Sequence, residues 1–80
     1  MKIPCIKHLV ETQTIDTLRE AEDQLINEET PGFEIEGEDE GEKLTHVFAA
    51  IWILNHMQDH GVAFPVALRE FTKKVRVSIN

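Results

Sequence analysis

Two histidines of the sequence have the spacing of a zinc site. His56 and His60 are four residues apart, so on a helix their imidazoles lie on one face and both can reach one metal ion. Helical zinc proteases carry a glutamate directly after the first histidine as their general base, whereas this chain carries Met57 there. Two exposed histidines at a helix end are the commoner finding, so we expect no metal. The alternative is a metal-binding or metal-responsive protein that uses His56 and His60.

A second candidate is the segment 34–42, which contains six acidic residues in nine positions. Its spacing fails the calcium-binding helix–loop–helix pattern, which needs oxygen ligands at alternate positions, a glycine sixth and a bidentate glutamate last. Three interpretations remain: a solvated entrance to the following helix, which we favour, a docking surface for a basic partner, and a metal site. The docking surface would consist of Glu36, Glu38, Asp39 and Glu40.

Cys5 is the one cysteine of the chain. His8 lies three residues further on, where it would share a helix face with the thiol and could serve as its base. A small buried thiol that fills a gap in the core is the commoner role, and we expect it here. Because no nucleophile, base and orienting group can be lined up from the residues available, the sequence predicts neither an enzyme nor a cofactor.

Composition argues against two classes of ligand. The net charge is −7 and the sequence pI is about 4.9, so phosphate backbones and anionic lipid surfaces would repel the chain, and we expect no nucleic-acid partner. The longest apolar run, residues 47–54, is far shorter than the roughly 20 residues that cross a bilayer. A single cysteine and the lack of a signal-like amino terminus predict a cytoplasmic protein.

The charges are strongly segregated along the chain. Residues 11–42 have a net charge of −12, whereas residues 43–80 have a net charge of +3. Either the ends fold back on the acidic middle, which is the favoured interpretation, or copies of the chain associate head to tail.

Apolar spacing and helix-end signals predict one all-α domain over residues 1–80. It is a small bundle of three to four helices, in which the last two form an antiparallel hairpin across the short link GVAF. A minor extended segment is expected near 33–36, where apolar residues alternate with glutamates. The expected helices are about 4–11, 15–28, 42–60 and 65–78.

The helix predicted over 42–60 is apolar on two sides. One side carries Leu44, Val47, Phe48, Ile51 and Leu54. A helix that is apolar on both sides must bury both, so the far side predicts contact with other helices or with a second copy. We expect a homodimer, with an interface at Ala49, Trp52, Ile53 and Met57.

Three stretches carry a resemblance: IKHLVE, EGEDEGEKLTHVFAAIWIL and FTKKVR. Together they resemble, over nearly the whole chain, a family of short, acidic bacterial proteins known chiefly from genome sequences and without an assigned activity. The resemblance implies a bacterial cytoplasmic setting and nothing about mechanism. From the residues themselves we predict a small cytoplasmic protein–protein interaction module that self-associates and presents its acidic segment to a basic protein partner.

Overall fold

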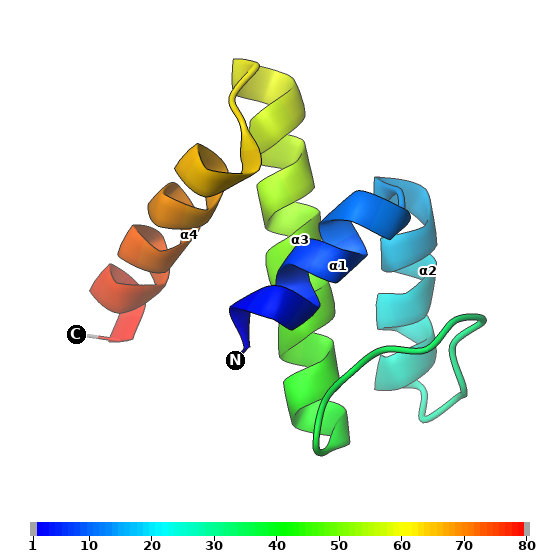
Figure 1. Ribbon diagram of the computed structural model, residues 1–80. Coiled ribbons are helices and arrows are strands. Elements are labelled where there is room, and N and C mark those ends of the chain that lie inside the picture. Colours follow the sequence, from blue (N-terminus) through cyan, green and yellow to red (C-terminus); the bar gives the residue numbers. More distant parts are fainter. Residues whose placement is uncertain (1, 80) are drawn as a thin grey trace.

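The computed structural model describes the backbone of residues 2–79 and the side chains of residues 2–75. This part of the chain forms four helices and contains no strand. They are α1 (Ile3–Thr12), α2 (Ile15–Ile26), α3 (Glu40–His60) and α4 (Phe64–Ile79) (Figure 1). The predicted all-α fold is confirmed, and every helix begins and ends within two residues of its predicted bounds.

Both amino-terminal helices are short and amphipathic. In α1, Pro4 occupies the first turn, where a missing N–H leaves no hydrogen bond unmade. In α2, the Thr14 hydroxyl accepts the Thr17 N–H, and the Thr17 hydroxyl accepts the Thr14 N–H, which forms a reciprocal cap. Each helix buries one apolar stripe, which consists of Cys5, Ile6, Leu9 and Val10 in α1 and of Leu18, Ala21 and Leu25 in α2.

Helix α2 ends two residues earlier than predicted because the chain closes a Schellman motif. The Glu29 N–H donates to the Gln24 carbonyl at 2.7 Å, and the Glu28 N–H donates to the Leu25 carbonyl at 3.1 Å. Glu28 therefore adopts the left-handed conformation, with φ at +61°. Glycine is the usual residue at this position, so Glu28 holds some backbone strain.

Helix α3 is the central element, and each of the other three helices packs against it. In Figure 1, α2 and α4 lie on opposite sides of α3, and α1 crosses in front of it. Gly61, at φ +61°, ends α3, after which α4 turns back along α3 and diverges from it toward its far end. Residues 33–36 form part of an irregular loop, which buried Ile35 holds against the core.

Helix α3 buries residues from both of its apolar sides: Val47 is fully buried, and Leu44, Ile51 and Leu54 pack against the core. Ala49, Ala50 and Ile53 are fully buried, whereas Phe48 is 55% exposed. The prediction that Ala49 and Ile53 contact a second copy is therefore wrong, because helices of the same chain already cover both. Small side chains such as Ala49 and Ala50 let neighbouring helix backbones approach α3 closely.

Trp52 and Met57, the other predicted interface residues, are only partly exposed. The ring centroid of Trp52 lies 5.6 Å from that of Phe71 in α4, and Met57 packs at the edge of the core. Both side chains thus make contacts within the chain. A contact with a second copy stays a prediction for these two residues.

Candidate functional site

An apolar surface between α2 and α3 is the main candidate site, and we call it the Phe48 face. Ile26 is 60% exposed and Phe48 is 55% exposed, the two highest values among the large apolar side chains that the structure describes. They line a shallow hollow of about 280 Å³. The Phe48 face consists of Glu22, Ile26, Leu44, Thr45 and Phe48.

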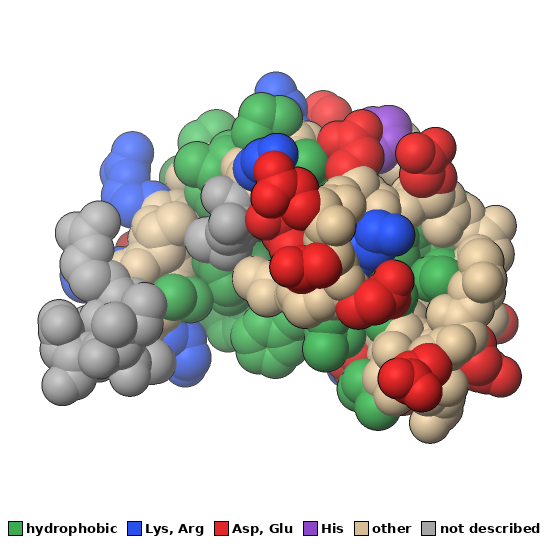
Figure 2. Space-filling view, turned by 90° about the horizontal axis from the view of Figure 1, so that it is seen from below, with side chains coloured by type: hydrophobic (Ala, Val, Ile, Leu, Met, Phe, Trp, Pro, Cys, Tyr) green, Lys and Arg blue, Asp and Glu red, His purple; other side chains and the backbone are tan. Residues whose placement is uncertain are grey.

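This face lies on the side of α3 that α1 does not cover. Phe48 is two residues from both His46 and Ala50, so it points about 160° away from each around the helix. His46 is hydrogen-bonded to Lys2 at the start of α1, and Ala50 is fully buried. In Figure 2, which looks from below Figure 1, apolar side chains form a continuous green area beneath the central acidic cluster. The fold therefore leaves Ile26 and Phe48 uncovered on this side of α3.

His46 is a fully buried polar side chain with both ring nitrogens hydrogen-bonded. The backbone N–H of Lys2 donates to Nε2 at 3.0 Å, and Nδ1 lies 2.7 Å from the carbonyl oxygen of Glu36. Since a backbone N–H can only donate, Nε2 must be unprotonated, and Nδ1 carries the proton that it gives to the Glu36 carbonyl. His46 thus joins three segments, the start of α1, the acidic loop and α3, which no sequence pattern had indicated.

Cys5 is buried, as predicted, and its Sγ donates to Oε2 of Glu36 at 3.1 Å. This hydrogen bond, together with burial, raises the pKa of the Cys5 thiol. His8, the base that sequence spacing offered, is exposed on α1. The thiol is therefore held in its protonated form, which is the opposite of what a nucleophile needs.

The acidic segment lies at the entrance of α3, with all four predicted docking residues exposed. Oδ1 of Asp39 accepts the Glu42 N–H at 2.8 Å and so caps the helix. Glu38 pairs with Lys2 at 3.8 Å. These contacts agree with the helix-entrance interpretation. Binding of a basic partner by Glu36, Glu38, Asp39 and Glu40 stays a prediction.

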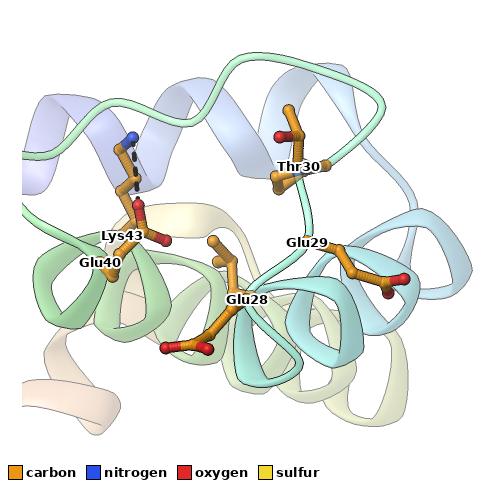
Figure 3. A pocket seen from close by; sticks show the side chains of 7 residues that line it. Glu28, Glu29, Thr30, Glu40 and Lys43 are labelled. Atoms are coloured by element: carbon orange, nitrogen blue, oxygen red, sulfur yellow. Dashed lines mark ion pairs between the residues drawn. The ribbon is translucent and has the colours of Figure 1, made fainter.

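A polar hollow of about 340 Å³ lies between the end of α2 and the start of α3. Figure 3 shows Lys43 paired with Glu40, at 3.9 Å, while the Glu28 and Glu29 carboxylates point in different directions. Acid–base or metal chemistry needs side chains that converge on one point. The labelled groups of this hollow do not converge.

His56 and His60 do lie on one face of α3, with ring centroids 4.3 Å apart. The His56 ring also stacks on Trp52, at 4.8 Å and 11° between the ring planes. No group of three or more His, Cys, Asp or Glu side chains is placed to hold a metal ion within the described residues. The metal alternative thus gains no third ligand from this part of the chain.

These observations define a small all-α domain with a buried histidine junction and an exposed apolar face. Between residues 2 and 79, no helix combines the length and apolar character that crossing a membrane requires. The chain belongs to DUF6952, a family of unknown function whose profile matches residues 1–80. Searches for similar curated proteins and for similar solved structures find no match.

Proposed function

We propose that this chain is a protein–protein interaction module that binds a second copy of itself through the Phe48 face. The observation that carries the proposal is the adjacency of Ile26 and Phe48, each more than half exposed and lining one hollow. A single exposed apolar side chain is ordinary, whereas adjoining ones mark interaction surfaces. The proposed dimer interface therefore lies on the uncovered side of α3, and not at the residues predicted from the sequence.

Burial of this face would stabilise a dimer. Covering the exposed half of a large apolar side chain contributes about 1 kcal/mol, and a two-fold interface uses each such side chain twice. The molecule measures 32 × 28 × 19 Å, so its broad faces are large enough for the roughly 800 Å² per partner of a standard interface. Few apolar anchors predict a weak dimer rather than an obligate one.

The size of the domain supports the same proposal. Eighty residues are near the lower end of what one core stabilises alone. Association would add apolar burial that the fold leaves unused on the Phe48 face. The folded monomer and the dimer would then be linked, with the melting temperature rising with concentration.

Sedimentation analysis over about 10 to 500 µM tests the proposal in the range of a weak complex. We expect the wild-type chain to dimerise and Phe48→Glu to remain monomeric, because a buried carboxylate without a partner opposes association. Ile3→Glu is the matched control, since Ile3 is 47% exposed on α1, away from the Phe48 face. It should dimerise like the wild type.

A wild-type chain that stays monomeric at the highest concentration would overturn the proposal. Equal dimerisation of Phe48→Glu and the wild type would also overturn it. Circular dichroism of each variant confirms that the helices are intact, so loss of association cannot be mistaken for loss of the fold.

A further inference from the structure

The Phe48 face contains a single charged residue, Glu22, whose side chain is partly buried where it lines the hollow. The other acidic residues of α2 are exposed: Asp16, Glu20 and Asp23. Arg19, the only cation of α2, is exposed as well. Among the residues that the structure describes, no cation forms an ion pair with Glu22. In the free chain, water therefore solvates this carboxylate.

Helix α3 brings no opposite charge to Glu22. The three residues that α3 contributes to the hollow are uncharged. The charged side chains beside them on α3 have other partners, since Glu42 accepts the Glu38 N–H at 3.3 Å and Lys43 pairs with Glu40 at 3.9 Å. Glu22 thus lines an otherwise uncharged surface.

A second copy on the Phe48 face would supply no cation from this face either. A two-fold interface places the same surface patch on both sides, so Glu22 would face the uncharged residues or the Glu22 of its copy. Each dimer would therefore remove two Glu22 carboxylates from water. An ionised carboxylate without a cation is costly to remove from water, whereas a protonated one costs much less.

We infer that protonation of Glu22 controls self-association, so that the Phe48 face binds a second copy more tightly in mildly acidic solution than at neutral pH. Solvent supplies the protons that the dimer takes up. An equilibrium that takes up protons is driven forward as the pH falls. This inference rests on the proposed function, since it specifies what regulates that interface.

Dimer dissociation constants from sedimentation analysis at about pH 7.5 and about pH 5.5 test the inference. We expect the wild-type constant to fall by about fivefold between these two conditions. Glu22→Gln keeps the shape of the side chain without its charge, so at the higher pH it should dimerise about tenfold more tightly than the wild type. It should also respond less to pH.

Glu11→Gln is the matched control, because it removes the same charge from an exposed residue on α1. It should follow the pH dependence of the wild type. Histidines also titrate in this range, but none of them lines the hollow. Their effect is common to the wild type and Glu22→Gln, so the difference in pH dependence between these two isolates Glu22. Circular dichroism at both pH values confirms that the helices are intact.

Equal pH dependence of the wild type and Glu22→Gln would overturn the inference. A weaker dimer in Glu22→Gln would also overturn it, because Glu22 would then pair with a cation across the interface. If Phe48→Glu still abolishes the dimer in either case, the proposed function stands and only this inference fails. A wild type that stays monomeric at both pH values would overturn both.

Discussion

Lys2 and His46 are joined by a hydrogen bond, in which the Lys2 backbone N–H donates to Nε2 of His46 at 3.0 Å. The other ring nitrogen bonds the Glu36 carbonyl at 2.7 Å. One neutral imidazole therefore ties the start of α1 and the acidic loop to the central helix, inside an otherwise apolar core.

Replacing His46 by leucine should destabilise the fold by about 2 kcal/mol. Leucine keeps the apolar volume, but it leaves the Lys2 N–H and the Glu36 carbonyl at this part-buried junction without their partner, and polar groups that lose a partner away from water are costly. Urea unfolding measures the loss. His8→Leu is the control and should change stability by less than about 0.5 kcal/mol, because His8 is exposed. Equal stability of the two variants would show that the His46 junction does not stabilise the fold.

The pKa of the Cys5 thiol is raised by its hydrogen bond to Glu36. The folded chain therefore binds this proton more tightly than the unfolded chain does. Its contribution to stability is present below the thiol's unfolded pKa and is lost as the pH rises through the folded value. The free energy of unfolding should thus fall on the alkaline side, and alkylation of Cys5 should be slow.

Glu36→Gln should lower the pKa of Cys5 and speed its alkylation by iodoacetamide at mildly alkaline pH. Glu38→Gln removes the same charge from a neighbouring carboxylate that pairs with Lys2 instead, so it should alter the rate less. If both variants react at one rate, the carboxylate contact does not control the thiol.

Asp39 caps α3 through its bond to the Glu42 N–H. Asp39→Ala should lower stability by about 1 kcal/mol, whereas Asp39→Asn retains a capping oxygen and should lose less. Glu40→Gln changes a neighbouring exposed carboxylate that pairs with Lys43 and should cost below about 0.5 kcal/mol. Thermal unfolding compares the stability of the three variants. An equal loss of stability in all three would mean that Asp39 stabilises α3 through its charge and not as a cap.

Glu28 adopts a left-handed backbone conformation, with φ at +61°. Glycine reaches this conformation without the clash of a Cβ atom, so Glu28→Gly should stabilise the fold by up to about 1 kcal/mol. Glu28→Ala removes the same charge but keeps Cβ, and it should show no such gain. A gain shared by both variants would trace to charge repulsion in the acidic segment.

The amphipathic helices and the helix ends could be predicted because local signals determine them. Pro4, Thr14 and Gly61 mark helix boundaries through backbone geometry that depends on few neighbours. The orientation of α3 could not be predicted, since apolar residues surround most of this helix and its periodicity does not distinguish inside from outside. Burial of Ala49 and Ile53, and exposure of Phe48, depend on three helices packing against α3 at once.

The histidine junction was beyond sequence reasoning for a different reason. Its partners are backbone groups of residues 2 and 36, and backbone groups carry no sequence signature. The position of the acidic segment at the start of α3, where Asp39 caps the helix, could be predicted from local sequence. The contact between Glu36 and Cys5 could not, because these residues are 31 positions apart in the chain.

An NMR dilution series of the wild-type chain tests self-association through the Phe48 face most directly. On dilution from about 500 to 10 µM, we expect the Phe48 ring and Ile26 methyl signals to shift together along one binding curve, while the Ile3 methyl signal on α1 stays fixed. Signals that are all independent of concentration, or shifts at Ile3 without shifts at Phe48, would contradict it.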